Sequence, residues 1–188
     1  MAPIIGILAS AQTAATLSSY ESIATVTVGA GGQSSITFSS IGTTWKHLQI
    51  RGISRSDDSA QAYSQTKLTI NGVTTNYTLH QIEAQGAGSA GAYALTGQAN
   101  TLFECTIADG SSANIYGATV IDILDYQDTN KYKTFRILAG YDANGSGRMG
   151  FTSGMTTANT NAVTSVTLAP RFGNFKQYTQ FALYGIKG

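Results

Sequence analysis

Between residues 20 and 188 the chain is a succession of short runs of β-branched and aromatic residues, each ended by Gly, Asn, Asp or Ser. Residues 45–54 (WKHLQIRGIS) show the pattern well, since Leu48 and Ile50 alternate with polar neighbours at a period of two. No part of this region places apolar residues at helical spacing over a useful length. About ten such runs separated by turn residues predict an all-β fold, a jelly-roll-like β-sandwich.

Local signals suggest how some of these runs pair. Residues 22–38 predict a hairpin whose turn is Gly29–Gly32, and Asn71-Gly72 is a favoured tight-turn pair. Residues 115–126 carry apolar side chains on both faces, which predicts a central core strand. We expect residues 132–138 to pair back onto it across a polar turn.

The first 19 residues lack this rhythm and are predicted to form an extended N-terminal arm ahead of the domain at 20–188. Ile4, Ile5, Ile7 and Leu8 make its beginning apolar, and Ser, Thr and Ala follow. So short a segment cannot form a hydrophobic core alone, and its exposed apolar side chains would promote association if they stayed in water. It therefore inserts into a neighbouring protein, which we prefer, or covers the domain's own sheet.

Only 11% of the 188 residues are charged, and the formal net charge is +1. Soluble domains usually have about 25% charged residues, so Ser, Thr, Asn and Gln must wet most of this surface. Two such surfaces meet at little cost in desolvation, which favours assembly. A net charge this small attracts neither nucleic acid nor an anionic membrane, and we expect neither as a partner.

The single cysteine, Cys105, excludes an intrachain disulfide, and its strand-like surroundings (TLFECTI) are typical of a small buried hydrophobe. No run of about 18 apolar residues occurs, so we expect no membrane helix. Met1–Ser10 has no basic residue ahead of its apolar run, so we expect no secretory signal. Synthesis in a reducing cytoplasm fits both observations.

Three patterns imitate ligand sites, and each lacks a required part. Gly86–Gly91 spells G-x-G-x-x-G without the long helix that must follow. Asp142–Gly147 matches the first half of a calcium loop, but Ser153 stands where a bidentate carboxylate is required. His47 and His80, the only histidines, have no local cluster of Cys or carboxylates. We therefore expect no cofactor and no metal.

Patterns for catalysis are incomplete as well. The chain has no G-x-S-x-G elbow. Paired carboxylates for glycoside cleavage would have to come from Glu83, Glu104, Asp122 and Asp125. Asp122 and Asp125 have opposite parity in a regular strand and would not share a face. The sequence predicts that the protein is not an enzyme.

Ten tyrosines, seven phenylalanines and one tryptophan supply aromatic rings, most of which we expect in the core. Tyr63, Tyr93 and Tyr141 lie in segments that look like loops, and they are the candidates for surface contacts. A mixed-charge cluster at a strand end predicts a solvated turn or a subunit contact. Its members are Arg51, Arg55, Asp57 and Asp58.

Strings spread over nearly the whole chain resemble a virion structural domain that is common in tailed bacteriophages. None of them is a catalytic signature. They are Pro3–Ser10, Ser22–Gly29, Ser35–Ile41, Trp45–Arg51, Asp122–Tyr126 with Thr129–Lys133, and Phe181–Gly188.

The resemblance implies a component of the virion, made in the host cytoplasm and displayed as a head decoration, fibre or tail appendage. It implies capsid or tail proteins as partners, with the arm as the anchor, and a host surface glycan as a further partner. Analogy with other phage appendages suggests a homo-oligomer, and specifically a trimer. Three functions stay open, in this order of preference: a capsid cement protein, a receptor- or glycan-binding adhesin of a fibre or tail, and a hydrolase of surface polysaccharide.

Overall fold

Twelve antiparallel strands build residues 19–188, the part of the chain that the structure describes apart from the Cys105 side chain. The structure is a computed structural model. Its strands are β1 (Tyr20–Thr27), β2 (Ile36–Phe38), β3 (His47–Ser54), β4 (Tyr63–Ile70), β5 (Tyr77–Gln85), β6 (Gly91–Gln98), β7 (Thr101–Ile107), β8 (Gly117–Leu124), β9 (Lys133–Asp142), β10 (Gly147–Thr156), β11 (Val166–Pro170) and β12 (Gln180–Ile186). Within this range there is no helix, and hence none that could cross a membrane.

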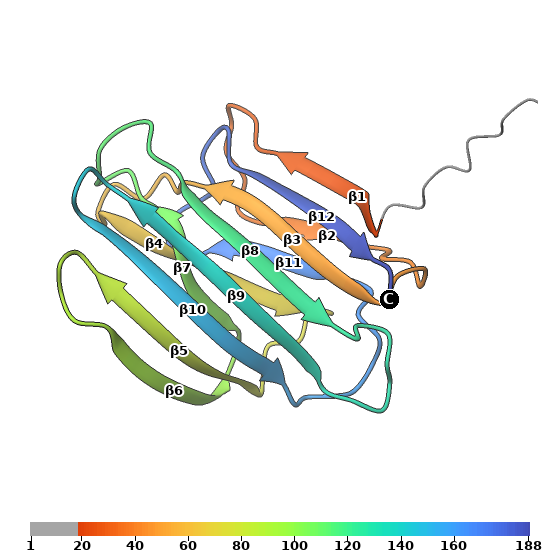
Figure 1. Ribbon diagram of the computed structural model, residues 1–188. Helices are drawn as coiled ribbons and strands as arrows, with labels where there is room; N and C mark the ends of the chain where they lie inside the picture. The colour runs from red at the N-terminus through yellow and green to blue at the C-terminus, as the bar shows by residue number, and fades with distance from the viewer. Residues whose placement is uncertain (1–18) are drawn as a thin grey trace, which may run out of the picture.

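The strands form two sheets that pack face to face, so the predicted β-sandwich is confirmed (Figure 1). The larger sheet has the order β1-β12-β3-β8-β9-β10-β5-β6, and the smaller one has the order β2-β11-β4-β7. Many neighbours are distant in sequence, as a jelly-roll-like topology requires. The predicted pairing of residues 115–126 with 132–138 is confirmed as β8 against β9.

The hairpin predicted for residues 22–38 is wrong. β1 pairs with β12 in the larger sheet, whereas β2 pairs with β11 in the smaller one. The Gly29–Gly32 turn carries the chain from one layer to the other, and Gln33 bridges to Phe175. A turn between layers uses the same residue types as a hairpin turn, so composition cannot distinguish the two.

The tight turn at Asn71-Gly72 forms as predicted, with positive φ at both residues (52° and 66°). The Val73 N–H donates to the Ile70 carbonyl at 2.9 Å. This turn also leads from one sheet to the other, because β4 belongs to the smaller sheet and β5 to the larger.

The core lies between the sheets and is apolar on both sides. Alternation within each strand sends every second side chain into it, as in β8, where Ile121 and Ile123 are fully buried. Tyr77 joins the layers, since its buried hydroxyl accepts the Ile70 N–H at 2.8 Å. The principal members are Ile36, Phe38, Leu48, Ile50, Leu68, Ile70, Phe103, Ile121, Ile123, Phe135, Ile137, Val166, Leu168, Phe181 and Leu183.

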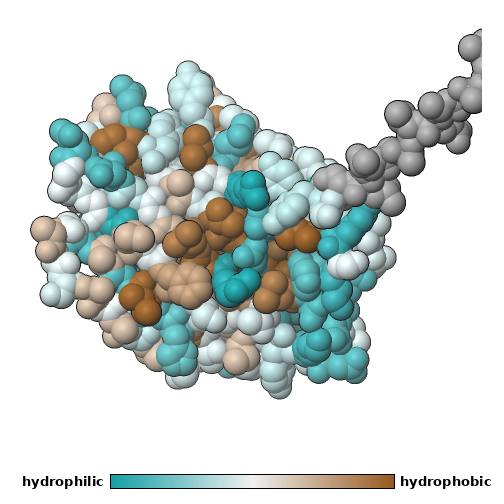
Figure 2. Space-filling model, in the orientation of Figure 1, coloured by the Kyte–Doolittle hydropathy of each residue, from teal (hydrophilic) through white to brown (hydrophobic). Residues whose placement is uncertain are grey.

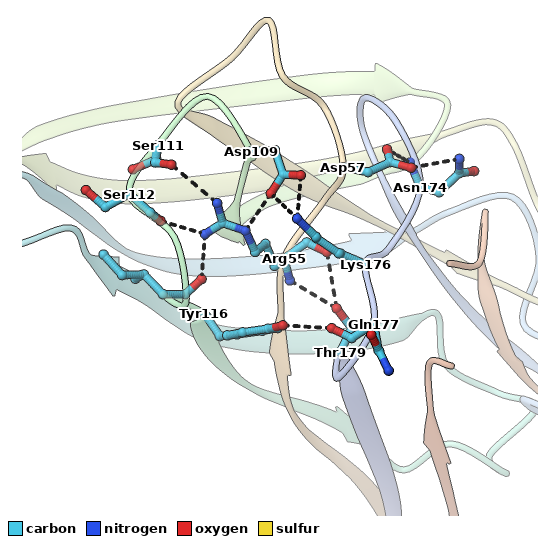
Figure 3. A network of polar contacts seen from close by, with 11 residues as sticks. Arg55, Asp57, Asp109, Ser111, Ser112, Tyr116, Asn174, Lys176, Gln177 and Thr179 are labelled. Atoms are coloured by element: carbon cyan, nitrogen blue, oxygen red, sulfur yellow. Dashed lines mark hydrogen bonds and ion pairs between the residues drawn. The ribbon is translucent and has the colours of Figure 1, made fainter. Parts of the chain in front are cut away.

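Arg55 is buried at the end of the sandwich and holds three loops together (Figure 3). Its Nε donates to Asp109 Oδ1 at 2.8 Å, and its Nη1 donates to the carbonyls of Ser112 and Ile115 at 2.9 Å. Lys176 donates to the same carboxylate at 2.6 Å. The expectation of a solvated turn is therefore wrong for Arg55, because its carboxylate partner comes from a distant loop.

We predict that Asp109→Asn lowers the free energy of unfolding at pH 7 by about 1.5–3 kcal/mol, the usual value of a hydrogen bond to a charged group. Hydrogen bonds from Lys176, and then from Arg55, hold the pKa of Asp109 below its ordinary value of 3.8. The stabilisation is therefore present above pH 3.8 and disappears as the pH falls through the folded-state pKa. Urea unfolding at several pH values measures it.

The control for this prediction is Asp142→Asn, on an exposed loop where the new amide oxygen can still accept the Gly145 N–H. We expect this variant to unfold like the native protein. A loss at Asp109→Asn that stays the same from pH 7 to below pH 3 would contradict an electrostatic role for the carboxylate.

Candidate functional site: an apolar sheet face and a polar pocket

The outer face of the larger sheet carries a continuous group of large apolar side chains. Residues that lie opposite one another on neighbouring strands form a row across five strands: Val120, Leu138, Phe151, Ile82 and Ala92. A second row beside it contains Ile53, Ala118, Gly140, Met149 and Ala84. We call these two rows the apolar face.

The large members of this face are open to solvent. Met149 is 59% exposed and Phe151 is 47% exposed, and Ile53, Ile82 and Leu138 are similar. Figure 2 shows hydrophobic side chains gathered over the middle of the sheet that stands in front in Figure 1. A contiguous exposed apolar patch of this kind marks an interaction surface, whereas scattered exposed apolar residues do not.

Strand β10 explains why these side chains point outward. Its inward positions are small or polar, and at Gly154 an added Cβ would lie 2.5 Å from the Phe135 ring. Thr152 is buried and bonds to Gln81 at 3.1 Å. The core is full without large residues from β10, so Met149 and Phe151 occupy the opposite parity.

Two hollows lie beside the ridge of large side chains. One of about 520 Å³ is lined by Ile82, Ala92, Ala94 and Phe151 with His80 and Ser153. The other, of about 330 Å³, is floored by Ala118 and Gly140 beside Leu138 and Met149. Small residues next to large ones create this relief, and no Asp, Glu, Lys or Arg side chain lines either hollow.

Polar groups border the apolar face on one side. Gln49 donates to Asp122 Oδ1 at 2.7 Å, and Arg136 lies 3.8 Å from the same carboxylate. Arg51 donates to Gln49 and lies over the Tyr184 ring at 5.7 Å. The border charges thus already have partners within the chain.

A polar pocket of about 290 Å³ lies where β5 and β6 extend beyond the smaller sheet. Arg148 is at its centre, 3.1 Å from a carboxylate oxygen of Glu83 and 3.1 Å from one of Glu104. Glu104 is fully buried as a side chain, and its other oxygen accepts a hydrogen bond from Gln65. Burial raises the pKa of Glu104 above its ordinary value, and Arg148 opposes this rise.

Tyr63 and Tyr93 line this pocket and Tyr141 stacks behind Tyr63, although the prediction that the three lie in loops is wrong. Each lies in a strand: Tyr63 in β4, Tyr93 in β6 and Tyr141 in β9. Tyr63 and Tyr141 stack at 6.3 Å, and the Arg148 guanidinium lies 4.5 Å above the Tyr63 ring. Both are half-buried and pack internally, so only Tyr93, 36% exposed at the pocket rim, presents a ring to solvent.

The structure brings together two of the four candidate carboxylates. Glu83 and Glu104 meet around Arg148, whereas Asp122 lies on the outer face and Asp125 lies in the turn after β8. Hydrogen bonds from Lys131, and then from Lys46, lower the pKa of Asp125 to about 2.

The remaining predicted residues fall in separate places. Asp142–Gly147 is the β9–β10 turn, His47 accepts the Asp125 N–H, and His80 lies on the outer face. Among the side chains that the structure describes, no three His, Asp or Glu gather closely enough to hold a metal ion. The arm residues Ile4, Ile5, Ile7 and Leu8 lie outside the described residues.

Sequence reasoning missed both β10 and β6, and with them the apolar face. The signal in β10 was available, since Met149, Phe151 and Met155 share one parity in the segment RMGFTSGMT. Its glycines weaken the strand pattern. In addition, the alternation of side chains along a strand does not by itself show whether the apolar side faces the core or the solvent.

No protein-family model matches the chain, and neither does any curated protein or solved structure.

We predict that Arg148→Met costs about 3–5 kcal/mol of unfolding free energy at pH 7, because it leaves a buried carboxylate without its cation. Glu104 then has a pKa raised further above 4.5. A raised folded-state pKa favours folding below the unfolded value and disfavours it as the pH rises, so the loss is smaller at pH 4. Chemical unfolding at both pH values tests this.

Two further variants sharpen that test. Glu104→Gln combined with Arg148→Met is expected to recover most of the loss at pH 7. Arg171→Met, at the exposed rim of the same pocket, is expected to cost about 0.5 kcal/mol or less. An equal loss at pH 4 and pH 7 for Arg148→Met would argue against the unpaired carboxylate as its cause.

Proposed function

We propose that the protein is a non-enzymatic structural component of a bacteriophage virion, a capsid decoration or cement protein that its N-terminal arm anchors to the particle. The observation that carries the proposal is the apolar face, a binding surface on an almost uncharged sandwich. The sequence strings quoted above resemble phage virion domains, and this resemblance indicates that the assembly in question is a virion.

Surface chemistry supports a role in assembly. A decoration protein must meet other proteins over a broad area, and low charge keeps desolvation cheap there. The arm adds an apolar segment, since Ile4, Ile5, Ile7 and Leu8 each contribute roughly 1.5–3 kcal/mol at most when buried. Ordering the arm offsets part of that gain.

A second function, binding of a host surface glycan by a fibre or tail adhesin, is favoured by the polar pocket. It offers the exposed Tyr93 ring for stacking on a sugar, with Gln65 and Glu83 nearby as hydrogen-bonding groups. Burial, and then the carboxylates of Glu83 and Glu104, raise the pKa of Tyr93 to about 12, so its hydroxyl remains a donor. Arg148 engages one oxygen of each glutamate, which favours binding here over hydrolysis.

Removal of residues 1–10 is expected to leave a folded domain that no longer joins the particle, because the apolar anchor is lost. Incorporation is measured by complementing virions that lack the protein, and folding by circular dichroism. A matched pair of point variants separates apolar character from length. Ile5→Asp with Ile7→Asp should abolish incorporation, and Thr13→Asp with Ser18→Asp should not. Normal occupancy without residues 1–10 would contradict the anchor.

The location of the protein distinguishes the two functions. A cement protein coats the head in many copies, and its loss lowers the heat resistance of the particle. For an adhesin, the purified protein binds host cells, and Tyr93→Ala reduces that binding at least about tenfold, the effect of losing roughly 1.4 kcal/mol. Tyr132→Ala, an exposed tyrosine outside the pocket, is the control. Unchanged cell binding by Tyr93→Ala would exclude the pocket as the glycan site.

A further inference from the structure

We propose that the apolar face is an interface between two copies of this chain, packed face to face about a two-fold axis. The proposal rests on the geometry of the larger sheet alone and stands whether or not the protein belongs to a virion. It assigns the homo-oligomeric contact to a particular surface, and it replaces the trimer suggested by analogy with a pairwise contact.

The outer face of the larger sheet, which contains the apolar face and its polar border, has the size that a stable pair needs. The sheet has eight strands, and β8 is typical with eight residues. Spacings of about 4.8 Å between strands and about 3.3 Å along them give roughly 34 by 26 Å, or about 900 Å². A stable specific interface buries about 800 Å² on each partner. The arrangement also has the expected anatomy, because an apolar centre lies beside a polar border.

Relief on the face is self-complementary, and this argues for a second copy as the occupant. A two-fold interface uses the same patch on both subunits, so each patch must offer both projections and recesses. Leu138, Met149 and Phe151 project from the middle of the sheet, and the two hollows lie on either side of them. Two copies turned by half a rotation can place the ridge of each into a hollow of the other.

The charges on the face permit the same arrangement. Asp122 and Arg136 lie next to each other in one cross-strand row, so a second copy brings both signs to the contact. Arg51 is already held by Gln49 and by the rings of Tyr20 and Tyr184. Asp122 and Arg136 therefore bring their own ion pair to the contact, and Arg51 keeps its hydrogen bond and ring contacts there.

The test is the mass of the full chain in solution, measured by analytical ultracentrifugation over a range of micromolar concentrations. We expect a dimer, twice the 19.7 kDa of one chain. Phe151→Glu should raise the dissociation constant at least about 100-fold, as expected for a central interface position. Phe172→Glu is the matched control, because Phe172 is 45% exposed against 47% for Phe151 and lies outside the apolar face. It should leave the dimer intact.

A second variant tests the contact by filling one of the two hollows. Ala94→Trp fills the larger hollow at an exposed position, and it too should dissociate the dimer while circular dichroism stays unchanged. A monomeric or trimeric native chain would overturn the proposal, since a foreign partner or another surface would then be the occupant. So would a dimer that survives Phe151→Glu, or one that is lost only when residues 1–10 are removed, which would make the arm the occupant.

Discussion

Burial of apolar strand faces between two sheets of unequal width is the constraint on which this molecule depends. The inner face of the larger sheet supplies half of the core, and the smaller sheet covers it with only four strands. β6 extends beyond that cover and is exposed along nearly its whole length. The polar pocket forms under this overhang, and the opposite side of the same sheet carries the apolar face. The polar pocket therefore follows from the mismatch in sheet width, and the apolar face follows from the small inward residues of β10.

The chain has few charged residues, and two of them, Arg55 and Arg148, hold separate parts of the structure together. Arg55 and Arg148 each pair with carboxylates, and each ties together segments distant in sequence. Arg55 fixes loops at the end of the sandwich, and Arg148 fixes the overhanging strands against β7. The surface is left to amides, hydroxyls and apolar side chains, which is a suitable surface for association with other proteins.

Much of the fold was predictable from local pattern, and the sites were not. The runs that became β3, β8, β9 and β12 alternate clearly, and the turn at Asn71-Gly72 formed as its residues require. The strand β10 escaped notice because its three glycines, two of them on the inner face, dilute its pattern. The polar pocket brings together Glu83, Glu104 and Arg148, which are far apart in sequence. No rule of sequence spacing predicts that these side chains lie close together.

The sequence by itself determined the all-β class and the small net charge, since these depend on a period of two and on composition. Only the tertiary structure decided which sheet each strand joins and which of its faces turns outward. Alternation shows that the two faces of a strand differ, but the layer that covers one of them comes from segments elsewhere in the chain. For β10 that layer left Met149 and Phe151 on the open side, because the Phe135 ring already fills the space beneath Gly154.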